Sequence, residues 1–414
     1  YTHFYSKDFY QLDLISSIEN IVSSSNQYDF GTSNHTLRWL HGFENNTNLV
    51  GTLVHSSYLP KNLFPEIDSS NVIQFESQIQ YTSAQFEYKD NSKDEFDYYA
   101  GVQFNQYNIN PGSLDPGSGN SIIPVDLSNE KSQEFSFFTN FNWNLSKRLS
   151  ISSGIRLTHF SLLGPYDQGL YDEDGFFEGT NTIASNESIA TYTNPEPRLG
   201  LNYKLGEYSS LKMSYASIYQ YIQNIYNTST PLPTSRWKIS DSYILPQKND
   251  TYGLGIYKNY PKTGIDFSVE SYYRNTQNNL TYKPGANFFL SEFLEQEVTQ
   301  AQGKSYGLEI SLRKTTGKVN GFFNYTWSRS QLKTNEPLIK NRINNNNWFS
   351  SDFDRPHTVN ASINFEGDAF NSFSFNFTGQ TGRPYTVANG VYKQENVTIP
   401  IFLSRNNDRL PVYH

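Results

Sequence analysis

Apolar and polar residues alternate singly along much of the chain. Between Glu134 and Leu145, the large apolar side chains fall on odd positions and most polar ones on even positions. Successive side chains of a β-strand point to opposite faces, so this segment is predicted to be a strand with one apolar and one polar face. Phe138 is an exception, since it falls among the polar positions. The same period of two, rather than the helical 3.6, recurs in residues 211–221, 265–274, 323–328 and 372–378.

This alternation, with breaks at Gly, Pro, Asn and Asp, predicts about fifteen strands. We expect strand centres near Phe4, Trp39, Val54, Ile79, Val102, Phe138, Ile155, Leu201, Tyr215, Leu254, Val269, Ile310, Phe323, Ala361 and Phe375. Short connections are expected at 44–48, 90–95, 146–148, 206–209, 260–264, 315–318 and 367–371, and long ones near Ser24, Pro65, Ser118, Asp174, Pro233, Phe289, Asn345 and Gln394. Alternating short turns and long loops are typical of an up-and-down barrel in an outer membrane, with the long loops outside.

Amphipathic strands also build soluble sandwiches, in which the apolar face packs on a second sheet. The composition favours a membrane barrel: 36% of the 414 residues are hydrophobic and 16% aromatic, and the mean hydropathy is -0.64. Aliphatic residues for a sandwich core are scarce, whereas the many Tyr and Phe suit a membrane–water boundary. Strands of about ten to twelve residues, tilted by about 40°, would cover an apolar band of roughly 25 Å. We therefore predict an all-β fold, a transmembrane antiparallel up-and-down β-barrel domain over residues 1–414.

The predicted number of strands is odd. An antiparallel meander closes on itself only with an even number, because its first and last strands must run in opposite directions to pair. Either the count is wrong by one, or the chain is a fragment whose edge strands find partners outside it. The start at Tyr1 within a strand pattern and the end at His414 after a loop favour a fragment.

Charge and motif content exclude several functions. The net charge of -8, without a cluster of Lys and Arg, argues against nucleic-acid binding. The absence of cysteine excludes disulfides and thiolate metal sites. The seven histidines are scattered and the chain has no HExxH, GxSxG or P-loop motif, so we expect no enzyme, no cofactor and no metal. No apolar run is long enough for a spanning helix, and any export signal is expected upstream of this chain.

Eight short stretches, in order along the chain, resemble the barrel of TonB-dependent outer-membrane receptors of the kind abundant in Bacteroidetes. They are NHTLRW (34–39), PTSRW (233–237) with ILPQ (244–247), VESYY (269–273), YGLE (306–309), NYTWSR (324–329), FDRPH (353–357), TGRP (381–384) and NNDRLPVYH (406–414). Each stretch is a weak signal alone, but eight in order, distributed over most of the chain, make a strong one. Ser235 and Val412 stand where relatives are expected to carry aspartate, which weakens any site inferred from those loops.

The resemblance implies a plug domain and about three strands before Tyr1, and about four strands after His414, which together with the strands here would make a barrel of about 22. It implies an active importer in the cell outer membrane, surrounded by lipid. The long loops would capture a scarce nutrient, and a TonB-type energy-coupling protein would act through the plug. Some related importers of glycans and peptides carry a surface lipoprotein lid, which would be a further partner. The sequence does not identify the nutrient.

Candidate substrate-binding residues lie in the predicted outer loops. Trp237, Trp348 and Phe349 could stack on a sugar or a flat ligand, or they could form an interfacial girdle or pack on neighbouring loops. Asp172 and Asp174 belong to the densest carboxylate cluster, which lacks the spacing of a calcium loop and is better explained as a solvated loop tip.

A second set of candidates falls on the polar parity of predicted strands and is expected to face the lumen. The set is Arg156, Arg198, Glu270, Arg274, Glu309 and Arg313. These side chains would either brace the wall and plug or line a substrate path. Both roles keep the charges away from lipid, where a charge in the middle of the bilayer costs about 2 to 4 kcal/mol.

Two other functions remain open at this point. The first is a passive porin, or a barrel that serves as a scaffold in a secretion or surface-lipoprotein complex. A porin usually narrows its pore with an inward loop and needs no plug. The second is a soluble, secreted, β-rich adhesin or hydrolase, which would stay in solution without detergent.

Overall fold

The computed structural model describes residues 1–12, 16–18, 21–23, 25–66, 71–119, 122–226, 235–286, 290–367, 370–394 and 397–412. Seventeen strands form one sheet, and two of them, β8 (Val125–Asp126) and β21 (Phe349–Ser350), have only two residues each. The other fifteen are β1 (Thr2–Leu12), β4 (Asn26–Gly42), β5 (Thr47–Pro65), β6 (Val72–Lys93), β7 (Phe96–Asp115), β9 (Glu130–Asn144), β10 (Leu149–Leu163), β13 (Ser188–Gly206), β14 (Ser209–Gln220), β17 (Gln247–Tyr260), β18 (Ile265–Tyr282), β19 (Val298–Lys314), β20 (Val319–Thr334), β22 (His357–Glu366) and β23 (Ser372–Gln380). Each contains one of the fifteen predicted centres, so the predicted strands are confirmed.

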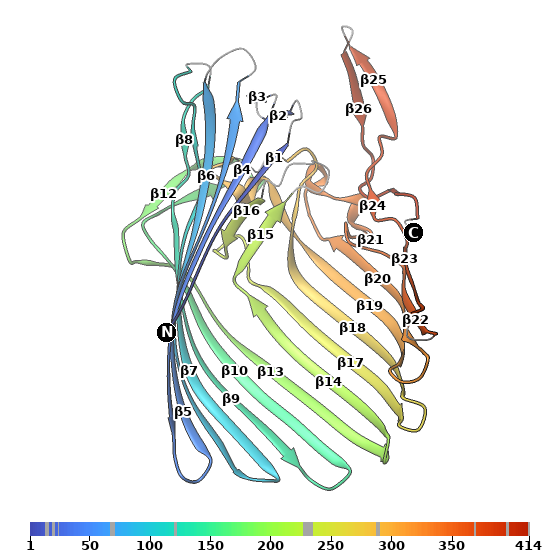
Figure 1. Cartoon of the computed structure of the whole chain (residues 1–414). Helices are drawn as coiled ribbons and strands as arrows, with labels where there is room; N and C mark the ends of the chain where they lie inside the picture. Colours follow the sequence, from blue (N-terminus) through green and yellow to red (C-terminus); the bar gives the residue numbers. More distant parts are fainter. Residues whose placement is uncertain are drawn as a thin grey trace.

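The fifteen long strands form an antiparallel meander in which each strand pairs with the next one along the chain. Within the described residues, β1 pairs with β4 alone and β23 with β22 alone. The sheet curves strongly and its strands are tilted, as the wall of a barrel would be (Figure 1). The predicted all-β, up-and-down antiparallel architecture is confirmed.

Most of the strands are longer than the predicted ten to twelve residues, although the range runs from the nine residues of β23 to the 22 of β6. The connection predicted near Pro65 is shorter than expected and follows that residue, since β5 continues to Pro65 and β6 starts at Val72. Phe64, Ile73 and Phe75 form a buried apolar cluster with Leu114 there, and this cluster keeps the strands paired beyond the expected end of the wall. The loop centres predicted at Ser24, Pro233 and Phe289 lie outside the described residues.

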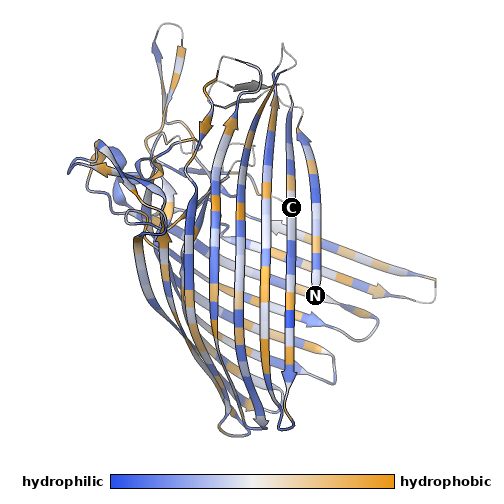
Figure 2. Ribbon diagram, turned by 90° about the vertical axis from the view of Figure 1, so that its left-hand side faces the viewer, coloured by the Kyte–Doolittle hydropathy of each residue, from blue (hydrophilic) through white to orange (hydrophobic). Residues whose placement is uncertain are grey.

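The two faces of the sheet differ as the alternation predicts. Phe137 is 48% exposed, whereas its neighbour Ser136 is fully buried on the other face. Cross-strand pairing joins Phe137 to Leu157 and Val102, which continues the apolar face across β10 and β7. Apolar and polar positions therefore alternate along each strand (Figure 2). Exposed rings in such numbers on one face are typical of contact with lipid.

Phe138 occupies the polar face because Gly101 makes room for it. A Cβ atom at Gly101 would lie 2.6 Å from Cζ of Phe138. The Arg156 guanidinium lies 5.9 Å from the centre of the Phe138 ring, on the strand beside it. The exception in the sequence pattern is therefore a packing site on the inner face.

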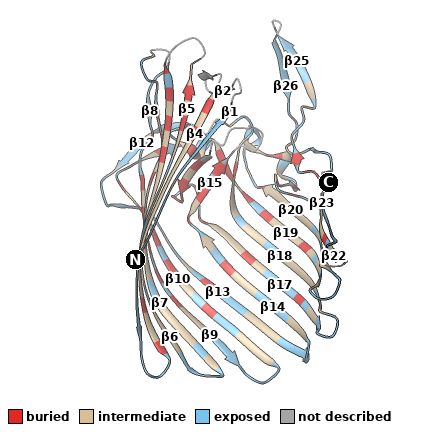
Figure 3. Cartoon of the chain, in the orientation of Figure 1, coloured by how far each residue is buried: buried red, intermediate tan, exposed pale blue. Residues whose placement is uncertain are grey.

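Additional hairpins lie at the loop end of the sheet, opposite the short turns (Figure 1). They are β2–β3 (Ser16–Ile18, Ile21–Ser23), β11–β12 (Tyr166–Tyr171, Phe177–Ile183), β15–β16 (Ile222–Tyr226, Ser235–Ile239) and β25–β26 (Gly390–Gln394, Val397–Ile401), and β24 (Pro384–Tyr385) pairs with β27 (Asp408–Arg409). Buried residues concentrate where these hairpins and loops meet the wall (Figure 3). In the part of the chain that the structure describes, no helix is long and apolar enough to cross a membrane.

Candidate functional site

The β15–β16 hairpin lies across the concave side of the sheet. β16 packs on β7 and β9, whereas β15 contacts β18, which is several strands away in the sheet. Only a segment that crosses the inside of the curve can touch both. The hairpin rests on a buried apolar cluster in which the rings of Phe160 and Tyr221 stack at 4.6 Å. It therefore narrows the space that the wall encloses.

A buried ion-pair group anchors this hairpin to the wall. Nζ of Lys238, which is 1% exposed, lies 2.8 Å from Oε1 of Glu130 and 2.9 Å from Oδ2 of Asp241. The backbone N–H of Ile239 donates to Oε2 of Glu130 at 2.7 Å. Burial by itself lowers the pKa of Lys238, but the two carboxylates raise it well above its ordinary value. The ammonium stays charged and holds the hairpin in place.

Four loops at the outer end enclose a cavity of about 670 Å³, which we name the aromatic loop pocket. Its lining includes the rings of Tyr171, Phe176, Phe177 and Tyr243 and the carboxylates of Glu295, Glu297 and Glu336, together with Lys283 and Lys340. The Tyr171 hydroxyl donates to Oε1 of Glu295 at 2.6 Å. Burial raises the pKa of the Glu295 carboxyl, which the hydrogen bond from Tyr171 only partly offsets. Ring faces beside hydrogen-bonding carboxylates suit a small ligand with polar edges.

The structure does not gather the five predicted substrate-binding residues in one place. Trp237 packs against the apolar cluster under the β15–β16 hairpin. Phe349 is 6% exposed and pairs with Leu332. Trp348 is 39% exposed, and Nζ of Lys304 lies 4.1 Å from its ring centre. None of the three lines the aromatic loop pocket.

Asp172 shapes a turn at the edge of the aromatic loop pocket. Its Oδ1 accepts the backbone N–H groups of Asp174 at 3.0 Å and of Phe176 at 2.7 Å. This turn presents Phe176 to the pocket, whereas Asp174 is exposed. The rings that line the pocket, Tyr171, Phe176, Phe177 and Tyr243, were missed by the sequence analysis. The first three stand next to the carboxylate cluster in the sequence, which was a usable signal.

The six predicted luminal residues are spread over the face that carries the β15–β16 hairpin. Arg156 and Arg198 line a small cavity beside Phe138, and the Arg156 Nη2 donates to Gln103 and to Ser136, each at 2.8 Å. Glu270 and Glu309 are direct cross-strand partners and line a second hollow of the wall, while Arg313 lines a third. Arg274 donates through Nε to Thr251 at 3.3 Å. The contacts of Arg156 brace neighbouring strands, and a role in a substrate path stays a prediction.

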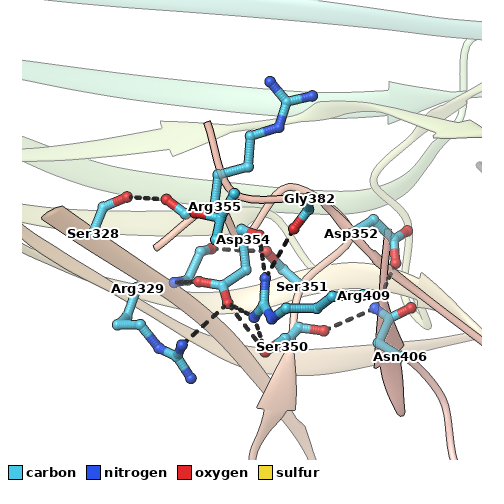
Figure 4. Close-up of polar contacts among 12 residues, drawn as sticks. Ser328, Arg329, Ser350, Ser351, Asp352, Asp354, Arg355, Gly382, Asn406 and Arg409 are labelled. Carbon is cyan, nitrogen blue, oxygen red and sulfur yellow. Dashed lines mark hydrogen bonds and ion pairs between the residues drawn. The ribbon is translucent and has the colours of Figure 1, made fainter. Parts of the chain in front are cut away.

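The buried carboxylate of Asp354, which the sequence analysis did not single out, joins four of the eight stretches that resemble TonB-dependent receptors (Figure 4). The Asp354 side chain is fully buried; it pairs with the Arg409 guanidinium and lies 3.8 Å from Nη1 of Arg329. Its Oδ1 accepts the backbone N–H of Ser330 at 2.6 Å, and Arg409 also donates to the Gly382 carbonyl at 3.3 Å. We name this group the Asp354 clasp. It ties the segment after β23 to the top of β20, which explains why those stretches stand out together.

Comparison with known proteins agrees with this architecture. The family model described as "TonB dependent receptor-like, beta-barrel" matches residues 3–407. No curated protein matches the chain. Similar solved structures include the FrpB iron transporter of Neisseria meningitidis (11% identity, TM-score 0.58, 97% of this chain and 59% of that one). They also include the ferripyoverdine receptor of Pseudomonas aeruginosa (11%, 0.56, 89% and 47%) and the copper transporter OprC (11%, 0.61, 95% and 57%).

At these identities the solved structures establish the fold. The chain spans about half the length of each of them. The family model covers nearly every residue from β1 to β26 and so includes the wall and the inner hairpin. This chain belongs to the TonB-dependent receptor-like β-barrel family.

Proposed function

We propose that this chain forms the wall and outer loops of a TonB-dependent active transporter in the outer membrane, of the type abundant in Bacteroidetes, which imports a scarce nutrient. The observation that carries the proposal is one curved antiparallel wall whose outward face exposes its rings and whose loops enclose a pocket at one end. Family membership supports the same reading. The proposal assigns binding and passage to the chain, and no catalysis.

In this mechanism the outer loops bind the nutrient first. A plug domain, supplied by the rest of the protein, would block the lumen until a TonB-type partner remodels it. Binding can be signalled to that partner only if the loops hold the nutrient more tightly in one state of the protein than in another. A surface lipoprotein above the loops would be a further partner, which would retain the nutrient near the pocket.

One observation also favours a passive porin as a second candidate. The β15–β16 hairpin crosses the inside of the wall, and inward loops are what narrow the pores of porins. The two candidates differ in their need for energy. An importer stops working when its TonB-type partner is removed, whereas a porin continues to conduct.

The test compares cells that carry the full-length protein with and without a TonB-type partner. We expect growth on a limiting nutrient, screened over iron chelates, cobalamin, peptides and oligosaccharides, to depend on both proteins. Replacing the outer loops 164–187 or 335–348, which lie between wall strands, by short Gly/Ser linkers should abolish this growth while the barrel still folds in the outer membrane. Growth that persists without the TonB-type partner would favour the porin instead.

A further inference from the structure

A second cavity, of about 390 Å³, lies beside the aromatic loop pocket and shares Lys283 with it. It is enclosed by the loop after β18, by the loop between β20 and β21 and by the segments on both sides of the β25–β26 hairpin. We name it the cationic pocket. Its size is within the range of small-molecule sites, about 300 to 1,000 Å³.

The lining of the cationic pocket carries an excess of positive charge. Lys283, Arg342, Arg383 and Arg405 face one lining carboxylate, that of Asp352. Among the described residues, none of these four cations forms an ion pair. Lys238 and Arg409 differ from these four, because each has a carboxylate partner.

Three of the four cations are held in place by neutral acceptors. Lys283 donates to the backbone carbonyls of Glu295 and Gln296, at 3.1 and 2.8 Å. Arg342 donates to the carbonyls of Glu336 and Pro337, at 2.9 and 2.7 Å. Carbonyl groups satisfy hydrogen-bonding capacity and fix the side chains, but they carry no formal negative charge.

Arg405 is fixed most firmly of the three. Its Nη1 donates to Oγ1 of Thr281 at 2.8 Å, its Nη2 donates to the Tyr282 carbonyl at 3.0 Å, and its guanidinium lies 3.5 Å from the centre of the Tyr282 ring. Burial lowers the pKa of both Arg405 and Lys283. The shift of Lys283 is opposite to that of Lys238, because burial lowers its pKa by more than the nearby carboxylates of Glu336, Glu297 and Glu295 raise it.

Arg383 supplies the free donor. It is exposed at the pocket, and its side chain has no hydrogen bond or ion pair with any described residue. Its backbone is nevertheless fixed, since its carbonyl accepts the N–H of Leu410 at 3.0 Å and Pro384 pairs with Arg409 in the β24–β27 ladder. A planar guanidinium on a fixed backbone is suited to bind an oxyanion with two parallel hydrogen bonds.

We propose that the cationic pocket binds a small molecule that carries two or more oxyanion groups, with Arg383 as its main contact and Lys283, Arg342 and Arg405 as the fixed positive surround. The rings of Tyr385 and Phe402, which also line the pocket, would contact the carbon skeleton of the ligand. Carboxylates and phosphates share this chemistry. That this ligand is the imported nutrient rests on the proposed function. That the pocket binds it does not.

The test is isothermal titration of the purified full-length protein in detergent, at low salt, with two probes. These are the tricarboxylate propane-1,2,3-tricarboxylate and inorganic pyrophosphate, and the neutral propane-1,2,3-tricarboxamide is the control ligand. We expect at least one anionic probe to bind, the neutral one not to bind, and affinity to fall as salt is raised. Tighter binding of the tricarboxylate or of pyrophosphate identifies the oxyanion.

Matched variants locate the binding. Arg383→Gln should weaken binding about tenfold or more, since a charge-assisted pair is lost, and Arg383→Lys should keep part of the affinity. Arg148→Gln, in a turn at the opposite end of the wall, should have no effect. Absence of binding by both anionic probes, or equal binding to Arg383→Gln and wild type, would overturn the inference. If neither anionic probe binds but transport still depends on the TonB-type partner, only this inference is refuted. If the probes bind but transport does not depend on that partner, only the proposed import function is refuted.

Discussion

Single residues on the inner face decide whether the wall can carry large side chains there. Gly101 is the clearest case, because the Phe138 ring fills the space that a side chain at position 101 would need. At the outer end, the Glu295 carboxylate shows a different constraint. It is half-buried in the aromatic loop pocket, where the charged form is disfavoured. Each of these residues leads to a prediction that a single substitution can test.

Replacing Gly101 by Ala should destabilise the wall by about 1 to 3 kcal/mol, the usual cost of overpacking. The added Cβ would lie 2.5 Å from the Phe86 carbonyl oxygen and 2.6 Å from the Phe138 ring. Gly206→Ala is the matched control, because a Cβ there meets nothing within 4 Å. Thermal unfolding in detergent measures the difference. Equal stability of the two variants would contradict this account of Phe138.

The Glu295 carboxyl should make the stability of the outer loops depend on pH. Because its pKa is raised in the folded protein, the folded state binds more protons than the unfolded state above the ordinary carboxyl pKa. Stability therefore falls as the pH rises through this range. Glu295→Gln keeps an oxygen acceptor for Tyr171 and removes the charge. We expect the variant to gain stability relative to wild type between pH 5 and pH 8, as followed by thermal melts. A difference in melting temperature between variant and wild type that stays constant from pH 5 to pH 8 would contradict the prediction.

At the scale of elements, the inner hairpin and the segment after β23 are both attached to the wall by ion pairs to a buried carboxylate. The β15–β16 hairpin is held through Lys238 and Glu130, and the later segment through Arg409 and Asp354. Both attachments join residues from distant parts of the chain. A buried pair stabilises one arrangement because each charge, once its partner is removed, is left uncompensated in a medium of low polarity.

Lys238→Ala should release the β15–β16 hairpin, because the carboxylates of Glu130 and Asp241 lose their common partner. Breaking a buried pair in this way costs about 3 to 5 kcal/mol. Lys147→Ala is the control, since Lys147 is exposed in a short turn. Hydrogen exchange should show faster exchange of residues 235–239 in Lys238→Ala alone, with the strands of the wall protected as before. Protection that is unchanged in the hairpin would show that the apolar cluster suffices to hold it.

For the whole molecule, the decisive property is the opposite character of the two faces of one continuous sheet. The outward face exposes its rings, while the inner face carries the β15–β16 hairpin, Arg156 and the Glu270–Glu309 pair. Such a wall is stable only if lipid covers the outside and polar groups or water fill the inside. The location proposed for this protein follows from that requirement.

Phe137→Lys should therefore impair membrane insertion more than a charge on the inner face. On the lipid side near the middle of the wall, the cost is about 2 to 4 kcal/mol. Asn142→Lys, on the same strand but with the opposite parity, is the matched control. Refolding into lipid vesicles, followed by the urea concentration at which the barrel unfolds, should separate the two variants. Equal midpoints would mean that the face of Phe137 does not contact lipid.

The alternation of residues by itself determined the strands and their faces, because the direction of a side chain from a strand depends only on its position in that strand. The segment from Glu134 to Leu145 therefore could be interpreted without knowing its neighbours, and the short turns follow from local turn residues. Strand ends were less well predicted, as at Pro65, where packing against Leu114 extends β5 and β6.

Only the tertiary structure decided which side chains meet. Lys238 and Glu130 are 108 residues apart and Arg409 and Asp354 are 55 apart, and neither contact has a signal in the local pattern. Phe138 looked like an error in the alternation until pairing placed it beside Gly101. The cationic pocket likewise combines three loops from separate parts of the chain. A binding site depends on charges and rings that folding brings together, whereas the wall depends on the two-residue alternation of apolar and polar side chains within each strand.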